Sequence, residues 1–127
     1  MAIEAVAGEY SLNVTSTTFE RLEGGASRAI LNVEGTASGF GTANGTLTMI
    51  IPGPGANAGP GQYTGVSFLE DGETVGVTGE GCWEKLGSEH KWRVRGINMY
   101  SNGEVNLSDG TLDLATRTFN GTLAPWT

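Results

Sequence analysis

The chain has 127 residues and a formal net charge of −7, and its 21 glycines are spread along the whole length. This length predicts one domain, residues 1–127, with a single continuous core. The acidic balance argues against a nucleic-acid partner and against an anionic membrane surface, because neither is bound without a basic patch.

The single cysteine, Cys82, excludes an internal disulfide and fits a reducing compartment, so we expect a cytoplasmic protein. No histidine is spaced to activate it, and we expect Cys82 to be a small buried residue. One histidine and one cysteine cannot complete a transition-metal shell without several carboxylates, and we predict no metal and no cofactor. The N-terminus has neither a basic region nor a long apolar run, so we expect neither a signal peptide nor a membrane span.

The first half of the chain reads as strands and turns, with no window of helical periodicity. We expect strands at residues 10–14, 29–37 and 47–51, the first continuing through a bulge toward Phe19. Residues 35–46 are so rich in small side chains that they form either one bent strand or two strands with a tight return at Asn44-Gly45. Residues 52–61, with three prolines, are the longest expected loop.

The second half has a cleaner pattern of short strands separated by turn signals. We expect turns at Asp71-Gly72, Asn102-Gly103 and Asp109-Gly110, and a bulge or barrel corner at residues 79–81. The strands between them are residues 63–69, 74–78, 82–84, 90–100, 104–107, 111–116 and 118–123. Eight or nine antiparallel strands favour closure over a sandwich, because sheet edges are a liability, so we predict an all-β barrel with little or no helix.

The segment 90–100 is the most informative strand, because alternate side chains point to opposite faces. One face carries three cationic residues followed by two apolar ones, and we expect it outside: Lys91, Arg93, Arg95, Ile97 and Met99. The other face then points inward: His90, Trp92, Val94, Gly96, Asn98 and Tyr100. We interpret this face as the wall of a ligand cavity, in which the missing side chain of Gly96 leaves room.

Candidate site residues follow from this assignment. His90, Asn98 and Tyr100 are candidates to orient a carbonyl or move a proton, and Trp92 and Trp83 are candidates to stack on an apolar ligand. Glu80 is a candidate general acid or base if it turns into the cavity.

Each assignment has a structural alternative. His90 at the strand start can contact backbone or solvent, and the tryptophans can simply fill a small barrel. Glu80 and Glu84 can lie on the outer face, where they balance the cationic residues of the neighbouring strand.

Several motifs together resemble a known group of proteins. They are Tyr63-Thr64-Gly65, the Thr-Gly-Glu-Gly unit at 78–81, Trp92-Arg-Val-Arg-Gly96, the Leu-Asp-Leu-Ala unit at 112–115, and Trp126. Over residues 60–126 the chain resembles small bacterial proteins similar to the allene oxide cyclase barrel. The resemblance implies a calycin-like eight-stranded barrel with a largely apolar cavity, whose relatives include cyclases of oxylipins and polyketides. It carries over no catalytic residue, because no position here matches the pocket residues of the plant cyclases.

Three functional hypotheses follow. The barrel is a cofactor-free isomerase or cyclase for a flexible apolar substrate, a binding protein for an apolar small molecule, or a structural or interaction module with a filled interior. We also expect a homo-oligomer, because Ile97 and Met99 place apolar side chains on an otherwise polar face.

Overall fold

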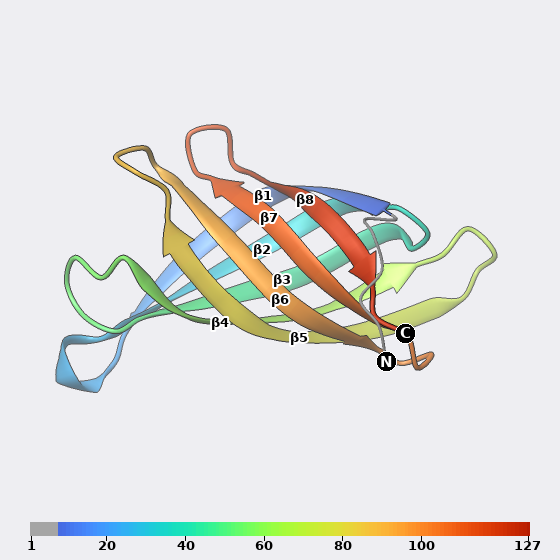
Figure 1. The fold of residues 1–127 in the computed structure, drawn as a ribbon, viewed down its shortest axis with the longest axis horizontal. Helices are drawn as coiled ribbons and strands as arrows, with labels where there is room; N and C mark the ends of the chain where they lie inside the picture. Colours follow the sequence, from blue (N-terminus) through green and yellow to red (C-terminus); the bar gives the residue numbers. More distant parts are fainter. Residues whose placement is uncertain (1–7) are drawn as a thin grey trace.

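The computed structural model describes residues 8–127, which form an eight-stranded closed barrel (Figure 1). The strands are β1 (Gly8–Arg21), β2 (Ser27–Ala37), β3 (Gly41–Ile51), β4 (Ala58–Phe68), β5 (Thr74–Lys85), β6 (Lys91–Tyr100), β7 (Val105–Asp113) and β8 (Thr118–Pro125). Within the described residues the only helical segment is a 3-10 turn, η1 (Glu23–Gly25). The all-β antiparallel barrel with little helix is therefore confirmed.

Closure leaves no strand without a partner on either side. Each strand pairs antiparallel with the next one, and β8 pairs with the first half of β1 from Gly8 to Asn13. The register of β1 against β2 shifts between Val14 and Ser16, which is the bulge expected before Phe19. No helix in residues 8–127 is long and apolar enough to cross a membrane.

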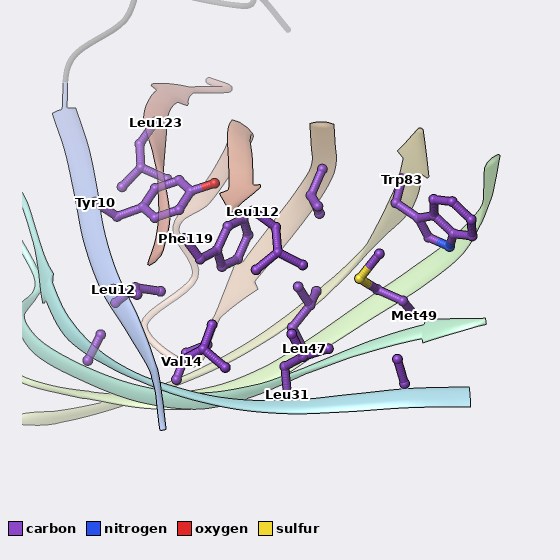
Figure 2. Close-up of a cluster of buried hydrophobic side chains, with 14 of the residues drawn as sticks. Tyr10, Leu12, Val14, Leu31, Leu47, Met49, Trp83, Leu112, Phe119 and Leu123 are labelled. Atoms are coloured by element: carbon purple, nitrogen blue, oxygen red, sulfur yellow. The ribbon is translucent and has the colours of Figure 1, made fainter. Parts of the chain in front are cut away.

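The apolar core lies inside the barrel and is built by alternate residues of every strand. Leu31 and Leu112 are the most deeply buried side chains. Figure 2 shows Val14, Leu47 and Phe119 in the same cluster, contributed by β1, β3 and β8. Burying one such side chain contributes about 2 kcal/mol to folding.

The turn expected at Asp109-Gly110 lies inside a strand instead, and so does the return that was one of two alternatives for residues 35–46. Asp109-Gly110 is part of β7 and Asn44-Gly45 is part of β3, and the chain reverses at residues 114–117 and 38–40. The reason is packing, because a Cβ atom at Gly110 would collide with the hydroxyl of Tyr10, and one at Gly45 would collide with that of Tyr63. These glycines make room for aromatic rings inside the barrel and do not reverse the chain.

The bulge expected at residues 79–81 is also absent, since β5 keeps one register with β4 and β6 over its whole length. Gly79 leaves space for the side-chain amide of Asn98, and Gly81 for the carbonyl of Arg95. The turns at Asp71-Gly72 and Asn102-Gly103 are confirmed, and both of these glycines have the positive φ that a tight turn requires, 92° and 91°.

Candidate functional site

Strand β6 presents its two faces as its sequence pattern predicts. Val94 and Asn98 are buried inside, whereas Ile97 and Met99 are 41% and 52% exposed. Outside, Arg93 donates two hydrogen bonds to Asp109, from Nε at 2.9 Å and from Nη2 at 2.6 Å. These bonds raise the pKa of Arg93 and hold the pKa of Asp109 below its ordinary value.

Glu84 lies on the same outer face, where its Oε1 is 3.4 Å from Nη2 of Arg95 and 3.7 Å from Nη1 of Arg93. Glu80 is also exposed on this face. Glu84 therefore balances the arginines of β6, and Glu80 lies opposite Ile97 on the same outer face. This outer placement was the structural alternative to an inward general acid.

A cavity of about 80 Å³ opens beside the inner face of β6. Its wall includes three inward glycines that pair with one another across neighbouring strands, Gly61 with Gly81 and Gly81 with Gly96. A Cβ atom at Gly61 would meet nothing closer than 3.5 Å, and one at Gly96 would lie 3.3 Å from the carbonyl of Glu80, a tight contact. A Cβ atom at Gly81 would collide with the carbonyl of Arg95. The cavity thus lies where three consecutive strands carry no side chain on their inner face; we call these three glycines the bare wall.

The rest of the cavity wall is apolar with a few polar groups. Apolar side chains on the wall include Leu12, Leu47, Val77, Val94, Phe119 and Leu123. The buried or half-buried polar residues on the wall are Tyr10, Tyr63, Tyr100, Asn98, Ser67 and Ser108. Gln62, Glu80 and Arg95 also border the cavity, but their side chains are exposed. This composition is typical of a small-molecule site, where a few oriented polar groups select a mostly apolar ligand.

A short chain of hydrogen bonds orients the polar groups of β6. Asn98 Nδ2 donates to Asn106 Oδ1 at 3.1 Å, and Asn106 Nδ2 donates to the hydroxyl oxygen of Tyr100 at 3.1 Å. The Tyr100 ring stacks on Phe40, with ring centroids 4.3 Å apart and planes 13° apart. Because the Tyr100 oxygen is an acceptor in this chain, its own hydrogen remains available as a donor.

All three tyrosines on the cavity wall are neutral near pH 7. Burial raises the pKa of Tyr63 to about 12 and raises the pKa of Tyr10 still further. Burial also raises the pKa of Tyr100, against a smaller opposing effect of the hydrogen bond from Asn106. The cavity is therefore provided with phenol donors and not with phenolate bases.

The structure brings some of the predicted site residues together and separates others. Gly96, Asn98 and Tyr100 lie on the cavity wall, and Glu80 borders it, although its side chain is exposed on the outer face. The placement of His90 on this wall is wrong. His90 is exposed in a bend, because β6 begins one residue later at Lys91.

Trp83 and Trp92 also lie away from the cavity wall. Trp83 is buried and its Nε1 donates to the carbonyl of Ile50 at 3.0 Å. Trp92 packs against the core, with the Lys85 ammonium 5.6 Å from its ring centroid. Both rings fill the barrel, which was the alternative to ligand stacking.

Cys82 and two tyrosines were misjudged from the sequence. Cys82 is exposed, not buried, because it shares the outer face of β5 with Glu80 and Glu84. Neither Tyr63 nor Tyr10 was recognised as a site residue. The sequence did contain a signal for Tyr63. It shares one face of β4 with glycines at positions 61 and 65, which leave room beside its ring.

The fold and cavity define the class of molecule: a closed eight-stranded antiparallel β-barrel with an internal, mostly apolar cavity. In comparisons with known proteins, no family model, no curated protein and no solved structure matches this chain. Arguments about its function therefore depend on its own residues.

Proposed function

We propose that the barrel binds an apolar small molecule in its internal cavity, without a cofactor. The observation that supports this proposal best is the bare strip of wall at Gly61, Gly81 and Gly96, surrounded by apolar side chains. Protein interiors are closely packed, and an unfilled volume inside a barrel destabilises it. Asn98 and Tyr100 supply the oriented polar contacts that give such a pocket selectivity.

The volume of the cavity limits the size of its ligand. About 80 Å³ is roughly half of the ~150 Å³ of an engineered apolar cavity that accepts benzene. Ligands of roughly three to five non-hydrogen atoms fit by this comparison. A molecule of oxylipin size would need a wider barrel.

A cofactor-free cyclase or isomerase is the second candidate. One observation favours it: the Tyr100 hydroxyl is held by Asn106 with its hydrogen free to bond a carbonyl. Binding without turnover is the better-supported proposal, because the ionisable side chains that line the cavity from inside are tyrosines with raised pKa values. Such phenols are weak general bases at neutral pH.

Xenon uptake tests the proposal, because the gas enters apolar cavities without needing polar contacts. We expect the xenon NMR signal to shift on titration with the wild-type protein. Gly96→Leu should remove that shift by filling the cavity while leaving the β-rich circular dichroism spectrum unchanged. His90→Ala should change nothing, since His90 is exposed outside the cavity.

The matched control is Gly76→Leu, because Gly76 lies on the outer face of the same barrel and a Cβ there meets nothing closer than 3.9 Å. This variant should take up xenon like the wild type. Absence of xenon binding by the folded wild-type chain would refute the proposed function.

We also propose a cytoplasmic location. The free thiol of Cys82 is exposed, and an exposed thiol persists reduced in a glutathione-buffered compartment. Cell fractionation tests this proposal, and recovery of the protein outside the cytoplasmic fraction would contradict it.

A further inference from the structure

We propose that the ligand is a small neutral molecule with a hydrogen-bond acceptor, such as a ketone or aldehyde oxygen, and that the Tyr10 hydroxyl is its principal donor. This inference rests on the proposed function, because it takes the internal cavity as the binding site. It adds the chemical class of the ligand and names the residue that selects it.

The Tyr10 hydroxyl is the observation that points to a ligand. Tyr10 lies on the cavity wall and is only 7% exposed, yet its buried hydroxyl has no hydrogen-bond partner within residues 8–127. Figure 2 shows this oxygen, in red, directed away from β1 into the barrel. Nearly all buried hydroxyls in proteins are hydrogen-bonded, so a partner for Tyr10 is expected from the cavity, which the covered hydroxyl reaches once its ring shifts away from Gly110 and Gly121.

The barrel is built to receive this side chain. Gly121 pairs with Tyr10 across β1 and β8, and Gly110 pairs with Gly121 across β8 and β7. A Cβ atom at either glycine would come too close to the Tyr10 hydroxyl, so two successive strands omit a side chain where the ring lies. The ring itself packs edge-on against Phe119, with centroids 5.2 Å apart.

Packing alone does not require the hydroxyl. A phenylalanine at position 10 would make the same contact with Phe119 over the same two glycines, without leaving a buried polar atom unpaired. A tyrosine here therefore carries a cost that a partner in the cavity removes.

The charges around the cavity indicate a neutral ligand. The two charged residues near its wall, Glu80 and Arg95, have side chains on the outer face, where Arg95 pairs with Glu84. A carboxylate or an ammonium group in the cavity would be desolvated with no opposite charge beside it. The protonated phenols of Tyr10, Tyr63 and Tyr100 instead favour an acceptor oxygen.

The test compares two probes of the same shape, cyclobutanone and methylenecyclobutane, in which a C=CH₂ group replaces C=O. Both are titrated into the full-length chain with ¹³C-labelled tyrosine rings, and the dissociation constants are read from the NMR shifts. We expect cyclobutanone to shift the Tyr10 resonance. In Tyr10→Phe its affinity should fall roughly fivefold to tenfold, the effect of one neutral hydrogen bond, while that of methylenecyclobutane stays the same.

Thr64→Val is the matched control, since it removes a hydroxyl from the outer face of β4, outside the cavity, and leaves Tyr10 intact. It should preserve the ratio of the two dissociation constants. The inference is overturned if both probes bind and Tyr10→Phe leaves that ratio unchanged, or if propionate, a carboxylate of the same size, binds more tightly than cyclobutanone. If neither probe nor xenon binds, ordered water alone is the partner of Tyr10, and the proposed function fails as well.

Discussion

At the scale of single residues, Tyr10 combines a favourable contact with an unfavourable one. Its ring is well packed, but its hydroxyl is buried without a partner in the described part of the chain. Residues that keep such a cost are common at functional sites, where stability is given up for recognition.

Tyr10→Phe should therefore stabilise the unliganded protein. The variant keeps the contact with Phe119 and removes the unpaired hydroxyl, so we expect the free energy of unfolding to rise by about 1 kcal/mol. Urea denaturation of both proteins without ligand measures the difference. A loss of stability of similar size would mean that the hydroxyl is hydrogen-bonded in solution.

At the scale of elements, the turn between β2 and β3 packs on the core through Phe40. Phe40 lies between Gly39 and Gly41, whose φ angles of 80° and 69° require glycine, and its side chain folds back to stack on Tyr100. This turn links the hydrogen-bonded chain of Asn98, Asn106 and Tyr100 to the rest of the core.

Phe40→Ala should lower the free energy of unfolding by about 3 kcal/mol, because it removes a buried ring together with its stacking contact on Tyr100. The matched control is Phe19→Ala, since Phe19 is 66% exposed and its loss should cost less than about 0.5 kcal/mol. Thermal and urea unfolding of the two variants measure this contrast. Equal effects would show that Phe40 does not pack on Tyr100 in solution.

At the scale of the whole molecule, the outer surface carries an apolar strip across β6 and β7. Ile97 pairs with Leu107, and Met99 pairs with Val105, so four apolar side chains lie together on the outer face. Such a strip on an acidic, mostly polar surface is typical of a contact between subunits.

The homo-oligomer expected from the sequence stays a prediction. We expect light scattering to give a mass of at least two chains, and Ile97→Lys with Met99→Lys to give a monomer. Thr18→Lys, an exposed position on β1, is the control and should leave the mass unchanged. A monomeric wild type at high concentration would contradict the prediction.

The sequence was sufficient to predict the barrel and the inner face of β6. Both follow from local rules: glycine-marked turns at Asp71-Gly72 and Asn102-Gly103 reverse the chain, and alternate side chains of a strand point to opposite faces. Gly96, Asn98 and Tyr100 were placed on the cavity wall by this alternation alone. His90 was misplaced because the same rule says nothing of where a strand begins.

Only the tertiary structure decided which glycines are turns and where the cavity lies. The Tyr63 side chain lies over Gly45, and the Tyr10 hydroxyl lies over Gly110 and Gly121, so a larger residue at any of these positions would collide with a tyrosine from another strand. The bare wall of Gly61, Gly81 and Gly96 exists because the registers of β4, β5 and β6 align three glycines. These contacts depend on the register between neighbouring strands. A two-residue period within one strand excludes odd shifts of register but does not choose among even ones.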